Sequence, residues 1–173
     1  MPQVPDPACR PADLHLAFLV SPVTVRDNLA RMLTMPPLSD LPKEARGVAE
    51  LVLAEVLNNV AEHAYANETG LVTVTLRRVA GGVACHIVDQ GAAMPNGKLP
   101  DGKLPAIHLP SGPDQALDTL PEGGFGWHLI RSLTEDLTYS YAGGANRLCF
   151  LLPVPELSLT DKPGSQISQA TRD

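Results

Sequence analysis

The sequence has few of the features that would place the protein in a specialised class. Its three cysteines, Cys9, Cys85 and Cys149, are odd in number and widely spaced, which fits neither a disulfide framework nor a metal-ligand pattern. No apolar run approaches the roughly 18 residues that a membrane span needs. No basic segment followed by an apolar core, as in a signal peptide, begins the chain. We therefore expect a cytoplasmic protein that does not enter a membrane.

Basic residues are also scarce. The 13 lysines and arginines are outnumbered by 19 acidic residues, which gives a net charge of −6, whereas a nucleic-acid surface needs clustered Lys and Arg. We expect no direct contact with nucleic acid, and an acidic surface that meets small ligands or other proteins. The length of 173 residues suits one domain. We expect an irregular arm over residues 1–12, a domain over 13–153 and a flexible tail over 154–173.

The most informative stretch is residues 49–65. Its apolar residues recur every three or four positions, as in a helix with one buried face: Ala49, Val52, Leu53, Val56, Leu57, Val60 and Ala64. A neighbouring edge of the same helix carries Glu55, Asn59, Glu62 and His63. Helix stability does not require a carboxylate, a carboxamide and an imidazole beside the core. This edge is therefore a candidate site, with plain solvation of polar residues as the alternative.

The remaining pattern predicts short strands and further helices. Strands are expected near residues 14–20, 71–79, 83–88, 137–141 and 147–152, and helices near 21–34 and 39–65. A further helix is expected after Trp127, marked by Leu129, Ile130 and Leu133. Glycine pairs at 81–82 and 143–144 are expected to form hairpins. This order predicts an α+β two-layer sandwich, in which helices cover one face of an antiparallel or mixed sheet. Residues 92–121 are rich in proline and too long for an ordinary connection, which is typical of a lid or of a disordered segment.

Two glycine motifs are candidates for contacts with a nucleotide. Asp89-x-Gly91 ends a strand, where the carboxylate can accept a hydrogen bond from the N6 amine of adenine and the glycine lets backbone approach a flat ring. An ordinary turn is the alternative for this motif. Gly123-Gly124-x-Gly126 opens a helix, whose first amides can bind phosphate oxygens. A flexible hinge is the alternative there.

Together these features resemble the Bergerat ATP-binding fold of the GHKL superfamily. More narrowly, the chain resembles the anti-sigma-factor serine/threonine kinases and their regulatory relatives. The narrower resemblance depends on the runs Ala54–Asn59, His63–Tyr65 and Gly123–Glu135, and the resemblance as a whole covers about residues 12–153. No helix with a phospho-accepting histidine precedes the domain, which disfavours a histidine kinase.

The resemblance implies a role for each matching residue. Asn59 would be the ligand of Mg²⁺, and Glu55 would be the general base. Asp89 would recognise the adenine amine, with Gly91 passing close to the base. The phosphates would be cradled, beneath the closing lid, by the glycines Gly123, Gly124 and Gly126.

At three further positions the expected role has an alternative, or the residue departs from the family pattern. His63 would either lie near the phosphates or cap or pack its helix. Arg131 matches the family, but its spacing to Glu135 favours an ion pair on the helix surface. Ala93 stands where the family's D-x-G-x-G pattern has its second glycine. Because alanine resists positive φ, we expect a stiffer hinge at the start of the lid.

The resemblance also implies the activity and the partners. ATP and Mg²⁺ would be the cofactors, and the protein would phosphorylate a serine or threonine of a small STAS-type anti-anti-sigma protein. A sigma factor would be the second partner, and a homodimer is expected. Two alternatives stay open: a regulatory module that binds nucleotide without phosphotransfer, and a structural protein whose glycines are only hinges.

Overall fold

The computed structural model describes residues 13–102 and 125–154. The expected arm over residues 1–12, the greater part of the expected lid and the tail from residue 155 lie outside these ranges. In chain order the elements are β1 (Leu14–Val20), α1 (Thr24–Leu33), α2 (Lys43–Asn59), the π-helical turn η1 (Val60–Ala64), β2 (Gly70–Val79), β3 (Gly82–Asp89), the 3₁₀ turn η2 (Pro95–Gly97), α3 (Gly126–Leu133), β4 (Glu135–Ala142) and β5 (Ala145–Pro153).

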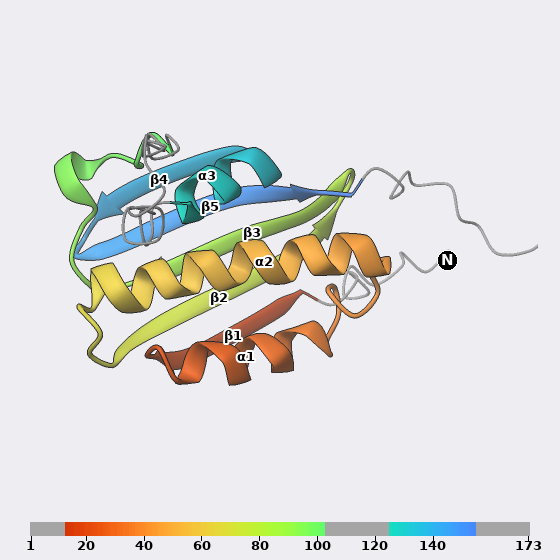
Figure 1. The fold of residues 1–173 in the computed structure, drawn as a ribbon, viewed down its shortest axis with the longest axis horizontal. Helices are drawn as coiled ribbons and strands as arrows, with labels where there is room; N and C mark the ends of the chain where they lie inside the picture. Colours follow the sequence, from red (N-terminus) through yellow and green to blue (C-terminus); the bar gives the residue numbers. More distant parts are fainter. Residues whose placement is uncertain (1–12, 103–124, 155–173) are drawn as a thin grey trace, which may run out of the picture.

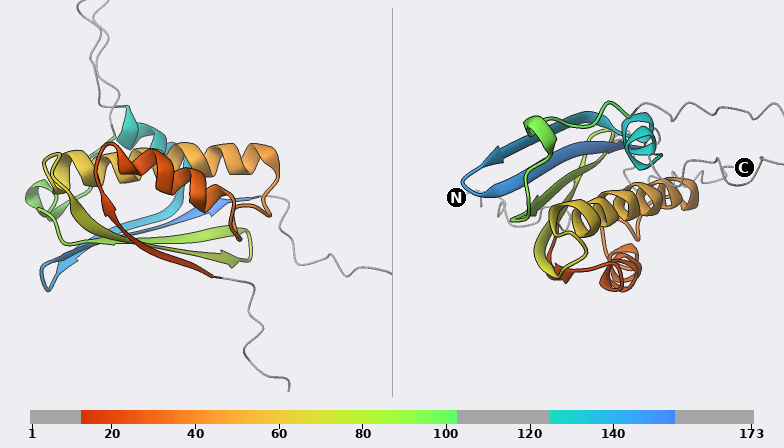
Figure 2. Two further views of the ribbon diagram at one scale, coloured as in Figure 1. Left: turned by 90° about the horizontal axis from the view of Figure 1, so that it is seen from below. Right: turned by 60° about the vertical axis from the view of Figure 1, so that its left-hand side comes forward.

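The fold has two layers (Figure 1). Five strands form one sheet in the order β1-β2-β3-β5-β4, and every neighbouring pair is antiparallel. The left view of Figure 2 shows the helices together on one face of this sheet. The predicted α+β sandwich is confirmed, with the antiparallel form of the sheet. No helix within the described ranges is long and apolar enough to cross a membrane.

The core lies between α2 and the sheet. The predicted apolar stripe of α2 is buried at Ala49, Val52, Leu53, Val56 and Leu57. On the sheet, alternate residues face this stripe because successive side chains of a strand point to opposite sides; those of β2 that are fully buried are Val72, Val74 and Leu76. Burial of each such side chain contributes roughly 1.5–3 kcal/mol, so the packing fixes the rotation of α2 and thereby the direction of its polar edge.

The end of α2 differs from the predicted continuous α-helix. After Asn59 the chain forms the π turn η1, in which the Tyr65 amide donates to the Val60 carbonyl at 3.1 Å. The turn therefore holds one more residue than an α-helical turn, and it changes the direction of the side chains that follow Asn59. His63 lies within this turn. Periodicity alone does not reveal such a turn, because Val60 and Ala61 are still buried as in an α-helix.

Strand register brings two polar residues to the same end of the sheet. Asp89 is the last residue of β3 and pairs with Asn146 of β5. Next to Asn146, the hairpin between β4 and β5 turns at Gly143 and Gly144, which both have positive φ, a conformation that glycine adopts without strain. At the opposite end of β5, Val154 is buried and its amide donates to the Gly81 carbonyl at 2.7 Å.

Candidate functional site

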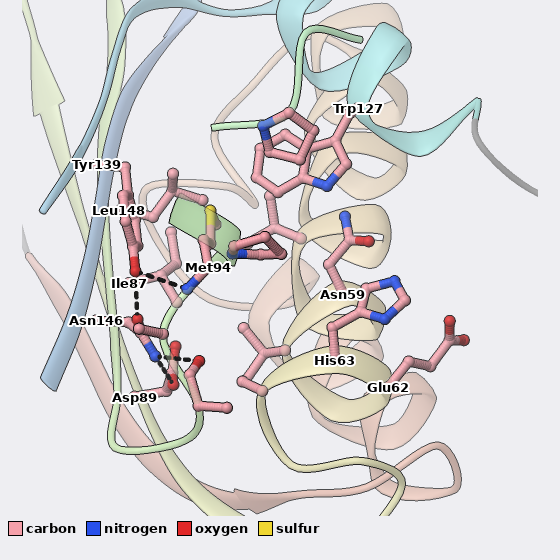
Figure 3. Close-up of a pocket in the computed structure, with 17 residues that line it drawn as sticks. Asn59, Glu62, His63, Ile87, Asp89, Met94, Trp127, Tyr139, Asn146 and Leu148 are labelled. Atoms are coloured by element: carbon pink, nitrogen blue, oxygen red, sulfur yellow. Dashed lines mark hydrogen bonds between the residues drawn. The ribbon is translucent and has the colours of Figure 1, made fainter. Parts of the chain in front are cut away.

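A cavity of about 530 Å³ lies between the C-terminal end of α2, the start of α3 and the sheet. Its helical wall includes Asn59, His63 and Trp127, and its sheet wall includes Asp89 and the residues around it. Figure 3 shows the two sets of side chains extending toward one another. The remaining lining is largely apolar, which is typical of pockets for small molecules: Val56, Val60, Ala64, Ile87, Ala92, Ala93, Met94, Pro95, Pro100 and Leu148.

Asp89 is a buried carboxylate at the end of β3, with 6% of its surface exposed. Its Oδ1 atom accepts hydrogen bonds from the Gly91 amide at 2.9 Å and from Asn146 Nδ2 at 2.7 Å. Burial raises the pKa of Asp89, and the two donors offset part of this rise. Among the described residues, no donor is bonded to Oδ2. One oxygen of the carboxylate is therefore held by protein and the other remains available as an acceptor.

Gly91 is required by a close approach of backbone. A Cβ atom at this position would overlap the carbonyl of Ala64, the last residue of η1. The next amide, that of Ala92, donates to the same carbonyl at 2.8 Å. The expectation placed a flat ring beside Gly91, whereas its close neighbour in the structure is the end of the helix. Ala93 lines the cavity and is not among the residues with positive φ, so its backbone is unstrained, and the expected stiffer hinge stays a prediction.

Tyr65 joins the helix to the same segment. Its hydroxyl donates to the Leu71 carbonyl at 2.7 Å and accepts from the Gln90 amide at 2.9 Å. Burial raises the pKa of this hydroxyl, and the negative charge of Asp89 raises it further, against the bond from Gln90. The ring covers Gly70, where a Cβ atom would overlap it. The sequence run that ends at Tyr65 thus anchors the turn that follows Asp89.

Asn59 contributes to the cavity a polar atom that lacks a hydrogen-bond partner among the described residues. Its Nδ2 atom is buried and has no hydrogen-bond partner within the described ranges. A buried polar group without a partner costs about 1–3 kcal/mol, so a native structure that keeps one often does so for binding or catalysis. The side chain extends into the cavity from the last residue of α2 (Figure 3).

Glu55 lies beside the start of α3 and is not part of the cavity wall. A Cβ atom on Gly126, the first residue of α3, would lie 2.5 Å from Glu55 Oε2 and 3.8 Å from Asn59 Nδ2. Glycine at this position therefore lets the backbone of α3 approach both side chains. The structure brings Glu55, Asn59 and Gly126 together, as predicted from the sequence. Gly123 and Gly124 lie outside the described residues.

His63 is exposed and lines the cavity near Asn59 (Figure 3). It forms no hydrogen bond to another described residue, so it neither packs in the core nor caps the helix there. His63 therefore faces the cavity, and its expected place near phosphates stays a prediction.

Arg131 does not form the ion pair with Glu135 that was expected. Its predicted partner, Glu135, begins β4, because α3 ends at Leu133. Arg131 Nε instead donates to the Pro100 carbonyl at 2.8 Å, and His128 Nδ1 lies 3.2 Å from the Gly102 carbonyl. The prediction of an ion pair on the helix surface is wrong because it assumed one further helical turn. Both side chains of α3 instead hold the chain at residues 100–102.

Sequence reasoning missed several residues of the site. Tyr139 lies in a predicted strand and Asn146 directly precedes another. The hydrogen bonds of Asn146 to Asp89 and of Tyr139 to Asn146 depend on strand register, which the sequence pattern does not give. Met94 lies in the expected lid and contributes an apolar wall. Trp127 was visible in the sequence, directly after the glycine motif, and only its large apolar ring signalled a role in a pocket.

Comparison with known families matches residues 21–151 to the histidine kinase-like ATPase domain. A comparison with curated proteins finds no match. The family match covers β2 to β4, both helices that carry candidate site residues, and nearly all of β5. It agrees with the GHKL resemblance at the level of the ATP-binding domain, and it does not distinguish the anti-sigma kinases within that group. On the match over residues 21–151, the chain belongs to the histidine kinase-like ATPase domain family.

Proposed function

We propose that the cavity binds Mg·ATP and that the protein is an anti-sigma regulatory factor, which transfers the γ-phosphate to a serine or threonine of a partner antagonist protein. Family membership implies ATP binding. The observation that carries the rest is that Asp89 and Asn59 line one cavity from opposite walls, with Gly126 beside Asn59. The cavity thus has an acceptor for a base at one end and polar groups for phosphates at the other.

The end near Asp89 suits adenine. Oδ2 of Asp89 would accept a hydrogen bond from the exocyclic N6 amine, since Oδ1 is already bonded to protein. Apolar side chains of Ile87, Met94 and Leu148 line the same part of the cavity and would contact the faces of the ring.

The groups near Asn59 fit a Mg²⁺ ion that is held mainly by the nucleotide. No cluster of three or more His, Cys, Asp or Glu that could hold a metal occurs in residues 13–102 and 125–154. Mg²⁺ in phosphate-binding sites keeps several waters and takes one or two oxygens from the protein. Asn59, whose side chain extends into the cavity, would hold the ion through Oδ1, because a hard cation prefers oxygen ligands. When bound, the ion offsets the negative charge of the phosphates.

Glu55 is the proposed general base. In the transfer, the partner's hydroxyl oxygen forms a bond to the γ-phosphorus, the bond from this phosphorus to the β–γ bridging oxygen breaks, and ADP leaves. The hydroxyl proton passes to the Glu55 carboxylate. Glu55 is half-buried and lies one helical turn before Asn59, beside the glycine that opens α3. His63, on the same wall as Asn59, would donate a hydrogen bond to a phosphate oxygen.

The proposed partners come from the resemblance to anti-sigma-factor kinases. The phosphate acceptor would be a STAS-type anti-anti-sigma protein, and the second partner would be a sigma factor bound by a homodimer. Exchange between the two partners would follow from their different affinities for the ATP and ADP forms, because a ligand shifts only those states that it distinguishes.

The test is a phosphotransfer assay with Mg·ATP and a purified STAS-type candidate. The wild type is expected to phosphorylate a serine or threonine, and Glu55→Gln is expected to bind ATP but lose transfer. Glu50→Gln serves as a matched control, since Glu50 is an exposed carboxylate of the same helix, outside the cavity. A Glu55→Gln variant that transferred phosphate at the wild-type rate would refute the assigned role.

One observation favours a second candidate, a module that binds nucleotide without phosphotransfer. Glu55 does not line the cavity, although it lies beside Gly126 at the start of α3. Tight ATP binding without transfer to any candidate partner would favour this module. A thermal shift with Mg·ATP separates both candidates from a purely structural role, since saturation at a hundredfold above Kd should add about 2.7 kcal/mol of stability.

A further inference from the structure

Four polar groups form one chain of hydrogen bonds from the loop after β3 to Asp89. The Met94 amide donates to the Tyr139 hydroxyl at 3.0 Å, and this hydroxyl donates to Asn146 Oδ1 at 2.6 Å. Asn146 Nδ2 then donates to Asp89 Oδ1 at 2.7 Å (Figure 3). The four residues come from β3, β4, β5 and the loop, so the chain connects segments that are distant in sequence.

The surroundings of Asn146 allow one orientation of its amide. Nδ2 faces three acceptors, since it lies 2.7 Å from Asp89 Oδ1, 3.1 Å from the Ala92 carbonyl and 3.3 Å from the Gly91 carbonyl. Oδ1 faces one donor, the Tyr139 hydroxyl. A flipped amide would place its oxygen against three other oxygens. The Tyr139 hydroxyl is directed toward Asn146 because its own acceptor position is taken by the Met94 amide.

We propose that Tyr139 and Asn146 determine the specificity of the cavity for a 6-aminopurine nucleotide, an inference that rests on the proposed nucleotide site. The two residues hold Oδ1 of Asp89 and leave Oδ2 as a pure acceptor for the ligand. They act through Asp89 and are positioning residues. The same chain fixes Met94, which contributes to the apolar lining of the cavity.

The chemistry of the purine explains why this orientation selects one base. A 6-amino group is a donor and matches the free Oδ2 atom, whereas a 6-oxo group is an acceptor and would face the carboxylate with like partial charge. Without Tyr139 or Asn146 the carboxylate loses its fixed position, and the site is expected to tolerate a 6-oxo purine better. A site built to pair with a polar group rejects analogues that lack it, because its own buried group is left unpaired.

The experiment compares the binding of ATP and inosine triphosphate, which differ at the 6 position of the purine. The wild-type protein is expected to prefer ATP by at least about tenfold, the size of one hydrogen bond to a charged group. Tyr139→Phe and Asn146→Ala are each expected to lower this ratio several-fold. The double variant is expected to match Asn146→Ala alone, because both residues act through the same amide. Tyr141→Phe is the control, since Tyr141 lies on the same strand and is exposed.

The ratio of the two affinities separates positioning from general support of the fold. A purely structural role would weaken both nucleotides equally and leave the ratio unchanged, and that result would overturn the inference. If Asn146→Ala does not fold, Tyr139→Phe decides alone, since it removes only a hydroxyl. A wild-type protein that bound neither nucleotide would overturn the proposed function as well. A wild type that prefers ATP, with both variants keeping the same preference, would overturn this inference only.

Discussion

The two ends of the cavity differ in how completely protein groups satisfy one another. At the end near Asp89, each polar side chain has a partner, and the chain of hydrogen bonds runs through Asn146 and Tyr139. At the end near Asn59, a buried amide nitrogen has no partner among the described residues. The difference indicates that the end near Asp89, the proposed base end, is formed before a ligand binds, whereas the end near Asn59, the proposed phosphate end, is completed by what binds there.

The glycines of the two ends show the same contrast. A Cβ atom on Gly91 would meet the backbone of Ala64, which cannot move without shifting η1. A Cβ atom on Gly126 would meet the carboxylate of Glu55, the far end of a side chain that can rotate. The first glycine therefore secures a fixed structure, and the second leaves room for a group with a chemical role.

The largest effect is expected at the unsatisfied end. Asn59→Ala should lower phosphotransfer about a hundredfold or more, because the proposed metal ligand is lost. The free energy of unfolding should stay the same or rise, because the variant also removes a buried group without a partner. A transfer assay and urea denaturation measure the two quantities. Asn58→Ala is the control, since this neighbouring side chain does not line the cavity. Normal transfer by Asn59→Ala would show that the metal assignment is wrong.

At the base end, Asp89→Asn should weaken ATP binding by about tenfold to a hundredfold, because a charged acceptor is replaced by an amide. Calorimetric titration with ATP and GTP measures this change, and the preference for ATP should fall as well. Asp40→Asn, which changes an exposed carboxylate away from the cavity, should bind like the wild type. An unchanged preference for ATP over GTP in Asp89→Asn would exclude Asp89 as the group that recognises the base.

A paired substitution tests the contrast between the glycines. Gly91→Ala should lower the free energy of unfolding by about 1–3 kcal/mol, the usual cost of overpacking against groups that cannot yield. Gly126→Ala should change it by less than about 1 kcal/mol, because the Glu55 carboxylate can rotate away, yet it should reduce phosphotransfer by displacing that carboxylate. Urea denaturation and the transfer assay are read on the same preparations. Equal losses of stability in both variants would remove the contrast.

The smallest effect is the dependence of stability on pH. Burial raises the pKa of Asp89 in the folded protein above its value in the unfolded chain, so the folded state binds the proton more tightly. The contribution of this group to stability is therefore full below the unfolded pKa and is lost as pH rises through the folded pKa. Thermal denaturation without nucleotide, from about pH 4 to about pH 7, should show the wild type losing stability relative to Asp89→Asn. A constant difference between the two proteins would contradict the raised pKa.

The sequence predicted the elements of the fold and the placement of the helical residues. The spacing of apolar residues in α2 identified its buried stripe, and with it the direction of Glu55 and Asn59, because a helix has one fixed period. The end of β3 at Asp89 was predicted from the change between a β-branched run and turn residues. Both predictions depend on local periodicity, which a single sequence contains.

What the sequence did not reveal depends on contacts between distant segments. The pairing of Asp89 with Asn146 requires the register of β3 against β5, and a shift of one residue would place Asn146 on the other face. The π turn at η1 leaves the buried pattern nearly unchanged, so periodicity cannot distinguish it from an α-helix. The partner of Arg131 was misassigned because an i,i+4 pair with Glu135 assumes that the helix continues past Leu133, where α3 ends.

The extra residue in η1 has a consequence for how such a site can be altered. In a regular α-helix, the rotation about the helix axis sets the directions of the buried side chains and of the ligand-binding side chains together. A change that improves the ligand contacts therefore disturbs the packing of the hydrophobic face. The wide turn after Asn59 lets His63 be aimed separately from the apolar stripe before it. Deleting a single residue from Val60–Ala64 would restore regular α-helical geometry and turn the His63 side chain to another side of the helix. The packing of the residues before Asn59 would be unchanged.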